Sequence, residues 1–486
     1  MSINRNTRRD FLKTIGLGVA SQTIGAHLFA IHANAAAGSR MNVLFIAVDD
    51  LRPQISCYGH QQMYSPNLDR LASEGVLFER CYCQVPVCGA SRSSLLTGVR
   101  PTRDRFTSYN TVADDDLPGA TSLPKLFREK GYHTVSNGKV YHHQNDGAGS
   151  WTEPAWRPSP AEDGNWRNYL KKENIQLAAG NQKGAGPPYE KIDVPDNAYF
   201  DGKIADKTIA DLQRLKDSAR PFFLAAGFLK PHLPFNAPAK YWDLYKRENI
   251  DLADNPFRPK GAPDAALHNW GELRAYETVP KEGPLPDEFA RTMIHGYYAC
   301  VSYTDAQIGK LLDELDRLDL RKNTVVVLWG DHGWNLGEHG LWCKHCNFET
   351  SLHSPLLISA PGVRGDKRVN SLTEFVDIYP TLSDLCGFST PDHLEGSSLT
   401  TLIENPDAAW KNAVFSRFKN GDSVKTDRYR YTEWTRDNGD IYARMLYDHK
   451  NDPMENVNIA AQPEKRDLVD DMQRILHSGW KSALPG

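Results

Sequence analysis

The chain lacks an excess of charge of either sign. Its 486 residues include 57 Lys and Arg and 61 Asp and Glu, which gives a formal net charge of −4. A protein that binds nucleic acid or an anionic membrane through a basic field needs an excess of positive charge. The composition therefore favours neither partner, and we predict no nucleic-acid binding. The length allows one large core, or a large domain and a small one.

Cysteine is too scarce for a disulfide framework, with eight in the whole chain. Cys343 and Cys346 form a CxxC pair, which is typical of zinc or redox sites. No second CxxC or histidine pair completes a four-ligand zinc site, and the flanking residues do not resemble a thioredoxin-type turn. We interpret the pair as a local structural feature and not as the active centre. Whether the two cysteines form a disulfide stays open.

Long hydrophobic runs are absent apart from one weakly apolar stretch near the N-terminus. Residues 7–13 (TRRDFLK) have the form of a twin-arginine signal, residues 15–31 are apolar, and residues 33–35 supply small side chains for a peptidase. A membrane anchor is the alternative reading, but this stretch contains polar residues. We predict a signal peptide over residues 1–37, export by the twin-arginine translocase to the periplasm or the medium, and no membrane span in the mature chain.

Short continuous apolar runs predict strands that are buried on both faces. They cover residues 43–48, 133–136, 222–226, 324–329 and 355–358. Helical patterns lie between them, at 122–130, 206–215 and 286–318. This alternation predicts an α/β fold with a mostly parallel sheet sandwiched by helices. Short β-like runs and a helix over 464–480 follow, so we expect a catalytic domain over 40–408 and a small α+β domain over 409–486.

Reactive side chains follow four of these predicted strands. In an open parallel sheet, ligands bind beyond the carboxyl ends of the strands. One Asp after a strand is commonly a turn residue or a helix cap, but four such placements on one edge predict a site. The residues concerned are Asp49 and Asp50, Asp331 and His332, Lys139 and His142, and Lys230 and His232.

The carboxylates among these residues call for a cation. Asp49, Asp50 and Asp331 cannot share a site while ionised unless a cation joins them. Oxygen ligands favour a hard ion, so Ca²⁺ is our first choice and Mg²⁺ the second. His332 leaves zinc and manganese open.

Basic side chains surround the acidic centre. A metal ion surrounded by several basic side chains is typical of a pocket that binds a dianionic tetrahedral group, either sulfate or phosphate. Cys88, at the start of a predicted helix, would point into the same anion site. The basic set is Lys139, Lys230, Lys344, His142 and His232.

Six stretches carry a resemblance to a known family. They are NVLFIAVDDLRP (42–53), SPNLDRLASEGVLFERCYCQVPVCGASRSSLLTG (65–98), GKVYHH (138–143), PFFLAAGFLKPHLPF (221–235), GDHGWNLGEHGLWCK (330–344) and LYDHKNDPMENVN (446–458). In this order they resemble the type I, formylglycine-dependent sulfatase family, and within it the iduronate-2-sulfatase group. The resemblance implies an alkaline phosphatase-like fold and hydrolysis of the sulfate esters of a sulfated glycan.

The resemblance also implies how Cys88 acts. This cysteine matches the one that a formylglycine-generating maturation enzyme oxidises, and Ala90 and Arg92 match positions of the recognised motif. The aldehyde would be hydrated to a geminal diol, one hydroxyl of which attacks sulfur while the substrate alcohol leaves. The second hydroxyl then helps to expel sulfate by re-forming the aldehyde, a release route that a sulfated serine lacks.

The same resemblance assigns roles to the other residues. Asp49, Asp50, Asp331 and His332 would hold one Ca²⁺ per subunit together with modified Cys88. Arg92 would orient the formylglycine and the carboxylates. Lys139, Lys230 and Lys344 would bind sulfate oxygens, His142 would assist the diol chemistry, and His232 would protonate the leaving oxygen.

Some positions depart from the family pattern. Many sulfatases carry Pro where Ala90 stands and Asn where His332 stands, and this histidine is shared with the iduronate-2-sulfatase group. The loop 104–116 and the insert 145–200, which should contact the sugar, do not closely follow the iduronate enzyme. Two alternatives stay open: a phosphatase or phosphonate monoester hydrolase of the same superfamily, and a non-catalytic exported glycan-binding protein.

Overall fold

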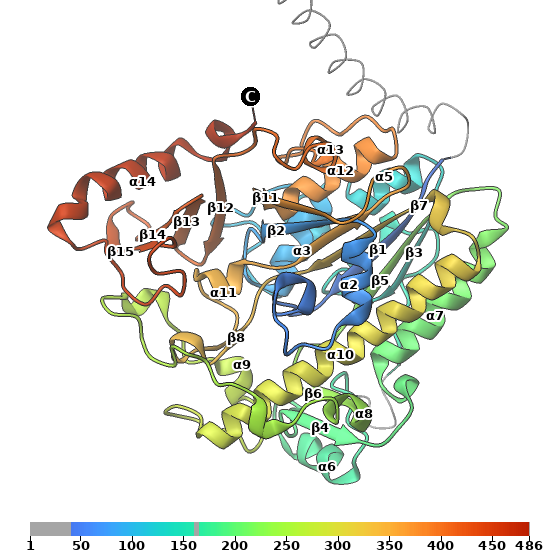
Figure 1. Cartoon of the computed structure of the whole chain (residues 1–486), viewed down its shortest axis with the longest axis horizontal. Coiled ribbons are helices and arrows are strands. Elements are labelled where there is room, and N and C mark those ends of the chain that lie inside the picture. The colour runs from blue at the N-terminus through green and yellow to red at the C-terminus, as the bar shows by residue number, and fades with distance from the viewer. Residues whose placement is uncertain (1–39, 160–164, 486) are drawn as a thin grey trace, which may run out of the picture.

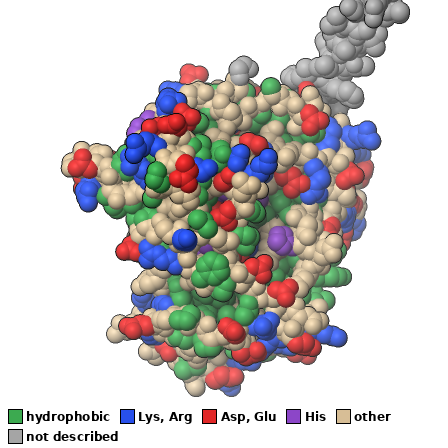
Figure 2. All heavy atoms as spheres, turned by 60° about the vertical axis from the view of Figure 1, so that its left-hand side comes forward, with side chains coloured by type: hydrophobic (Ala, Val, Ile, Leu, Met, Phe, Trp, Pro, Cys, Tyr) green, Lys and Arg blue, Asp and Glu red, His purple; other side chains and the backbone are tan. Residues whose placement is uncertain are grey.

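The computed structural model describes residues 40–159 and 165–485 (Figure 1). The predicted signal peptide over residues 1–37 lies outside these ranges. None of the helices described is both long enough and apolar enough to cross a membrane. Acidic and basic side chains are intermixed over the face shown in Figure 2, in keeping with the small net charge.

A seven-stranded sheet forms the centre of the fold, in the order β11-β2-β10-β7-β1-β5-β3. Only β10 runs against its neighbours, β7 and β2. The five strands expected from apolar runs are present, and the sheet is mostly parallel as predicted. The strands are β1 (Asn42–Val48), β2 (Val76–Tyr82), β3 (His133–Gly138), β5 (Phe222–Phe228), β7 (Thr324–Gly330), β10 (Leu356–Ser359) and β11 (Lys367–Glu374).

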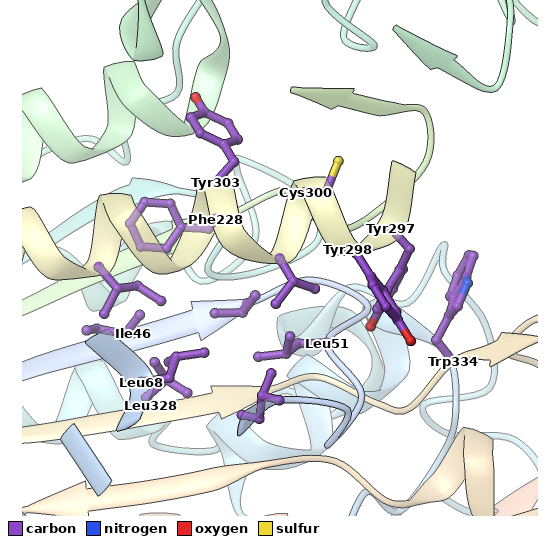
Figure 3. Close-up of a cluster of buried hydrophobic side chains, with 14 of the residues drawn as sticks. Ile46, Leu51, Leu68, Phe228, Tyr297, Tyr298, Cys300, Tyr303, Leu328 and Trp334 are labelled. Carbon is purple, nitrogen blue, oxygen red and sulfur yellow. The ribbon is translucent and has the colours of Figure 1, made fainter. Parts of the chain in front are cut away.

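Helices cover both faces of this sheet because its strands are apolar on both sides. Alternate residues of β1 enter opposite cores: Leu44 and Ile46 pack into one cluster, Val43 and Phe45 into the other. Figure 3 shows the first cluster, with Ile46 and Leu328 beside the long α10. That face carries α2 (Pro66–Ser73), α7 (Phe200–Lys216) and α10 (Asp287–Arg317). The other carries α3 (Cys88–Thr97), α5 (Leu123–Glu129), α12 (Ile378–Leu385) and α13 (Thr400–Glu404).

The C-terminal part builds a separate antiparallel sheet in the order β12-β13-β14-β15. Val424 of this sheet packs with Val469 and Met472 of α14 in a small core of their own. The predicted boundary at 408/409 falls just before the first of these strands and stays a prediction. The elements are β12 (Ala413–Phe418), β13 (Gly421–Thr426), β14 (Tyr429–Thr435), β15 (Ile441–Asp448) and α14 (Arg466–Ser478).

Short elements line the loops around the sheet. The strands β4 (Tyr189–Ile192) and β6 (Phe235–Pro238) pair in parallel, and β8 (Asn335–Leu336) and β9 (Trp342–Cys343) pair antiparallel. The short helices are α4 (Ala113–Asp116), α6 (Lys172–Gly180), α8 (Ala239–Trp242), α9 (Gly271–Arg274) and α11 (Glu349–Leu352).

The apolar-run criterion missed β2 and β11 in the main sheet and β13 in the small one. At the edge of the main sheet, β11 alternates between buried and exposed positions and begins with two basic residues. Its neighbour β2 contains Glu79 and Arg80, and Glu79 forms an ion pair with Arg368 across the strands. Charged pairs at a sheet edge stabilise strands without a continuous apolar run.

A close backbone approach fixes where β3 and β5 end. A Cβ atom on Gly227 would lie 2.1 Å from the carbonyl oxygen of Lys139. Since overpacking typically costs about 1–3 kcal/mol, we expect Gly227→Ala to lower the free energy of unfolding by about that amount. Urea denaturation measures it, with Gly180→Ala, which has open space around its Cβ, as the matched control. Equal denaturation midpoints for the two variants would contradict the prediction.

Candidate active site

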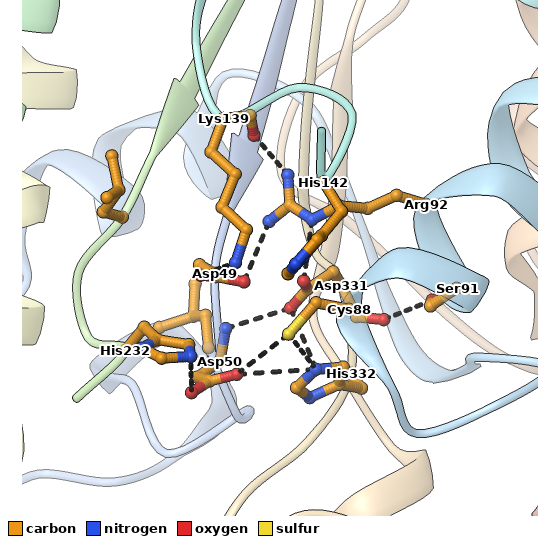
Figure 4. A network of polar contacts seen from close by, with 12 residues as sticks. Asp49, Asp50, Cys88, Ser91, Arg92, Lys139, His142, His232, Asp331 and His332 are labelled. Atoms are coloured by element: carbon orange, nitrogen blue, oxygen red, sulfur yellow. Dashed lines mark hydrogen bonds and ion pairs between the residues drawn. The ribbon is translucent and has the colours of Figure 1, made fainter. Parts of the chain in front are cut away.

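Four adjacent strands bring the predicted site residues to one edge of the sheet. β7, β1, β5 and β3 are neighbours and parallel, so their carboxyl ends lie side by side. The side chains that follow them converge in Figure 4. Asp49, Asp50 and Asp331 offer carboxylate oxygens that all lie within 4.8 Å of one another. The predicted convergence of strand ends is therefore present.

The backbone of Asp50 explains how two consecutive carboxylates reach one site. Neighbouring residues of a strand point to opposite faces. Asp50 leaves the extended conformation with a φ of 59°, a left-handed geometry that the surroundings must hold. Its amide donates to Asp331 Oδ1 at 2.9 Å, and the Tyr297 hydroxyl donates to its carbonyl at 2.9 Å. These two contacts keep both Asp49 and Asp50 turned inward.

Arg92 links the carboxylates from α3. This side chain is fully buried. Its Nε donates to Asp331 Oδ2 at 2.8 Å, and its Nη2 donates to Asp49 Oδ1 at 3.2 Å. Its Nη1 donates to the backbone carbonyls of Lys139 and Val140. One planar guanidinium thereby holds the ends of β1, β3 and β7 in fixed relation.

Burial and charge act differently on the two adjacent carboxyls. Burial alone would raise the pKa of Asp49, but Lys139 and Arg92 hold that pKa well below its ordinary value. Burial raises the pKa of Asp50 to about 7, although Lys344 opposes the shift. Lys344 Nζ lies 3.1 Å from Asp50 Oδ1. Asp50 is thus the carboxyl whose ionised form gains most from a further cation.

Cys88 is the first residue of α3 and lies inside the carboxylate cluster. Its Sγ is 3.3 Å from His332 Nε2 and 3.9 Å from Asp50 Oδ1. Burial raises the pKa of this thiol well above its ordinary value. The Cys88 side chain therefore contacts the groups predicted as metal ligands, as the sequence pattern required.

His332 presents a ring nitrogen to the same centre. Its Nδ1 lies 2.9 Å from the carbonyl oxygen of Gly333, which only accepts, so Nδ1 carries the proton. Its Nε2 then faces Asp50 Oδ1 at 3.4 Å and Asp331 Oδ1 at 3.6 Å. These distances exceed those of N–H···O hydrogen bonds. A lone pair facing two carboxylates fits a cation held between them, so this donor set suits a metal ion.

The three predicted sulfate-binding lysines occupy different environments. Lys139 Nζ pairs with Asp49 Oδ2, and Lys344 pairs with Asp50. Lys230 Nζ instead donates to the backbone carbonyls of His232 and Pro234, at 2.9 and 2.5 Å. Lys139 and Lys344 line the central cavity, while Lys230 lines a smaller one behind it. A contact between Lys230 and sulfate stays a prediction.

The two predicted catalytic histidines both line the central cavity. Burial lowers the pKa of His142 to about 2, with Lys139 adding to the shift, and its Nδ1 has no hydrogen-bond partner among the described residues. His232 directs Nδ1 at the carbonyl oxygen of Leu233, 2.6 Å away. Burial and Lys344 lower the pKa of His232, while Asp49 and Glu272 oppose them.

Glu272 is a site residue that the sequence pattern did not reveal. Its Oε1 lies 3.1 Å from His232 Nε2 and 2.8 Å from Lys344 Nζ. Burial would raise the pKa of Glu272, but Lys344 and His232 hold it well below its ordinary value. It belongs to α9, inside the loop region 236–286 that lacks periodicity. The only sequence signal was the length of that loop, which is typical of binding loops.

The cavity above these residues has a volume of about 790 Å³. The loop 104–116 contributes Tyr109, and the insert 145–200 contributes Arg157, Trp166 and Arg167. Burial lowers the pKa of Arg157 to about 10, and this side chain forms no ion pair within the described residues. Both segments that were expected to face the substrate therefore line the cavity.

The CxxC pair lies beside the site without forming a disulfide. Cys343 and Cys346 are both free thiols. Cys346 Sγ lies 3.0 Å from Ser351 Oγ. This segment contributes Lys344 to the site, because this lysine lies between the two cysteines in sequence and its ammonium contacts Asp50.

Two protein-family profiles match the chain. The sulfatase profile covers residues 41–388, and one described as N-sulphoglucosamine sulphohydrolase, C-terminal, covers residues 337–481. The first spans well over half of the chain. The chain therefore belongs to the sulfatase family, and it is a sulfuric ester hydrolase.

Individual relatives agree with this assignment. The chain is 33% identical to human iduronate 2-sulfatase over an alignment of 517 positions, which covers 88% of this chain and 92% of the human protein. It is 31% identical to a sulfatase from Formosa agariphila over 458 residues, which cover 90% and 86% of the two chains. The predicted resemblance to the iduronate-2-sulfatase group is confirmed.

A solved structure is similar in fold. It is a protein in complex with its substrate D-glucosamine-2-N,6-O-disulfate, and it matches with a TM-score of 0.71 at 22% identity. The match covers 92% of this chain and 99% of the other. The predicted fold class, alkaline phosphatase-like with a mostly parallel central sheet and a small C-terminal α+β part, is confirmed.

The buried position of Arg92 makes a stability prediction. Arg92→Ala would leave Asp49 and Asp331 with less compensation in the interior, so we expect the free energy of unfolding to fall by about 3–5 kcal/mol. Arg70→Ala is the control, since Arg70 pairs with Glu74 and Asp313 at the surface, where such pairs contribute about 1 kcal/mol or less. Urea denaturation compares the two, and similar losses would show that burial of the Arg92 pairs is immaterial.

Proposed function

We propose that the protein hydrolyses sulfate esters of a sulfated glycan through a formylglycine formed from Cys88, with one bound Ca²⁺. The observation that carries this proposal is the meeting of Cys88 with the carboxylate cluster on the floor of a cavity lined by basic residues. The family assignment supports it, and human iduronate 2-sulfatase is a relative along most of the chain.

Five residues would hold the ion: Asp49, Asp50, Asp331, His332 and modified Cys88. Oxygen donors dominate this set, which favours Ca²⁺ over softer metals. When bound, the ion supplies positive charge that compensates the carboxylates and the developing charge on the nucleophile.

The chemistry of residue 88 follows from its position. The Sγ atom stands where one hydroxyl oxygen of a hydrated formylglycine would lie, since both are bonded to Cβ. One hydroxyl gives up its proton to solvent and attacks sulfur, the bond between sulfur and the substrate oxygen breaks, that oxygen takes up a proton, and the sulfuryl group is transferred to residue 88. The second hydroxyl then loses its proton, the bond to sulfate breaks and the carbonyl re-forms. His142, which lines the same cavity as Cys88 and has no hydrogen-bond partner on Nδ1 among the described residues, would accept that proton.

His232 is the proposed acid for the leaving oxygen. Both of its ring nitrogens face acceptors, Nδ1 the Leu233 carbonyl and Nε2 the Glu272 carboxylate. Burial lowers the pKa of this ring, but the Glu272 carboxylate opposes the shift and favours the protonated form, which would donate its proton from Nε2. Lys139 and Lys344 would stabilise the sulfate oxygens, because both ammonium groups line the same cavity.

A sugar substrate suits the cavity wall. Trp166 and Tyr276 line the cavity with the Arg167 guanidinium over both rings, 4.5 and 5.3 Å from their centroids. Arg157 and Arg167 provide cations that have no carboxylate partner in the described part of the chain. Such a wall favours a glycan with further acidic groups over the sulfate ester of a small neutral alcohol. We further propose export by the twin-arginine translocase, from the signal over residues 1–37, after loading and maturation of the folded enzyme.

Replacement of Cys88 tests the mechanism. We expect Cys88→Ala to release no sulfate from an aryl sulfate or from any sulfated oligosaccharide in a panel of heparan, dermatan and algal types. Wild-type protein from a host with the maturation enzyme should release sulfate from at least one of them. Intact-peptide mass spectrometry should find an aldehyde in place of the thiol at residue 88.

Cys57→Ala is the matched control, because Cys57 is a half-buried free thiol that does not line the cavity. This variant should retain wild-type turnover. An aryl phosphate measured in parallel separates sulfatase from phosphatase, and faster phosphate release would favour the second class. Sulfate release by Cys88→Ala would remove residue 88 from the mechanism, and an unmodified thiol with no turnover would favour a binding protein.

Metal removal gives a test that needs no activity. Stripping the protein with EGTA should lower its unfolding temperature, and Ca²⁺ should restore it, because the ion binds only the folded site. At about 100 times the dissociation constant, the stabilisation is about 2.7 kcal/mol. Thermal unfolding with Ca²⁺, Mg²⁺ or Zn²⁺ added back ranks the ions. If neither EGTA nor added Ca²⁺ changes the unfolding temperature, the proposed ion is ruled out.

A further inference from the structure

We propose that a second hollow beside the catalytic cavity binds the part of an anionic oligosaccharide that extends beyond the cleaved sulfate ester. This inference rests on the proposed function. The hollow, which we call the distal hollow, has a volume of about 510 Å³. It lies between the loop 102–107 and the turn that joins β12 and β13. Residues of its wall include Arg103, Phe106, Arg417, Phe418, Lys419 and Tyr442.

The wall of the distal hollow is basic. It contains Arg103, Arg417 and Lys419 but no acidic residue. Arg417 pairs with Asp422, at 3.2 Å from Nε to Oδ1. Arg103 and Lys419 have no carboxylate within ion-pair distance among residues 40–159 and 165–485. Concave cations without counter-charges attract anionic groups such as sulfate or carboxylate.

Aromatic side chains complete this wall. Tyr442 is 44% exposed, and Phe418 and Trp434 lie nearby in the same lining. The Lys419 ammonium lies 5.4 Å from the Phe418 ring centroid, so cation and ring occupy one patch. Flat apolar rings suit the C–H face of a sugar, while the cations suit its acidic substituents.

The distal hollow adjoins the catalytic cavity. The Phe418 ring stacks on the His345 ring with centroids 5.9 Å apart and an interplanar angle of 29°. His345 lines the catalytic cavity next to Lys344. The loop that supplies Arg103 and Phe106 to the distal hollow supplies Tyr109 to the catalytic cavity. The two hollows share no described lining residue, but this ring stack and this loop connect their walls, so a bound chain that leaves the ester at Cys88 would continue across them.

The shared loop is fixed in place. The Phe106 amide donates to Asp116 Oδ2 at 2.7 Å. A Cβ on Gly89 would lie 2.5 Å from the Tyr109 carbonyl oxygen, so the loop lies directly against the start of α3. A path with fixed walls costs a ligand little ordering energy. An acidic peptide would feel the same charges, but continuity with the cavity for the ester favours an oligosaccharide.

Chain length and charge reversal test this inference. The substrate is a tetrasaccharide of the best glycan in the panel above, compared with its mono- or disaccharide and with 4-methylumbelliferyl sulfate. We expect kcat/KM to rise with chain length in the wild type. Arg103→Gln combined with Lys419→Glu should lower kcat/KM for the tetrasaccharide at least tenfold and leave that for the aryl sulfate within twofold. Lys450→Glu, an exposed lysine outside this wall, is the matched charge control.

Binding measured without turnover provides the second arm. In a Cys88→Ala background, calorimetry should show weaker binding of the same tetrasaccharide when Lys419→Glu is added. Equal kcat/KM for short and long substrates would overturn the proposed role of the distal hollow, and so would a double variant with the same kcat/KM as Lys450→Glu. The proposed function would stand in both cases. A wild type that carries the aldehyde yet hydrolyses no sulfate ester would instead overturn the proposed function and this inference with it.

Discussion

Compensation of buried negative charge at the carboxyl edge of the central sheet is the constraint on which the rest depends. Asp49, Asp50 and Asp331 are all inaccessible to solvent, and an isolated buried carboxylate is strongly disfavoured. The compensating groups come from elements far apart in sequence: Arg92 from α3 and Lys344 from the segment after β9. Each element therefore has its place fixed by charge as well as by apolar packing.

The same constraint explains which features could be predicted from sequence. Continuous apolar runs such as the one over 43–48 reveal a central strand because both faces are buried. The charged residues at their ends predict a site because they follow four strands at one edge of the sheet, whereas a single Asp after a strand is commonly a turn residue or a helix cap. β11 could not be found in this way, since an edge strand with one exposed face needs no apolar run. Glu272 could not be found either, because a four-residue helix in an irregular loop is too short to show a hydrophobic periodicity.

Residue type alone also failed to separate His332 from His232. Each directs Nδ1 at a backbone carbonyl oxygen one residue further along the chain. The difference lies in what Nε2 meets. For His332 it is Cys88 Sγ at 3.3 Å with Asp50 and Asp331 at 3.4 and 3.6 Å, and for His232 it is Glu272 Oε1 at 3.1 Å with Asp50 Oδ2 further away at 3.9 Å. The family resemblance assigned the two histidines different roles, and their surroundings supply a physical reason for that difference.

Glu272 shows how the site is matched to a single tetrahedral group. One of its carboxylate oxygens contacts both Lys344 Nζ and His232 Nε2. The two donors can therefore be no further apart than the sum of these contacts, 2.8 and 3.1 Å. On a sulfate ester, the bridging oxygen and a terminal oxygen are attached to one sulfur and lie close enough to meet two such donors at once. The loop that carries Glu272 thus limits the spacing between the candidate acid, His232, and the cation proposed to bind sulfate, Lys344.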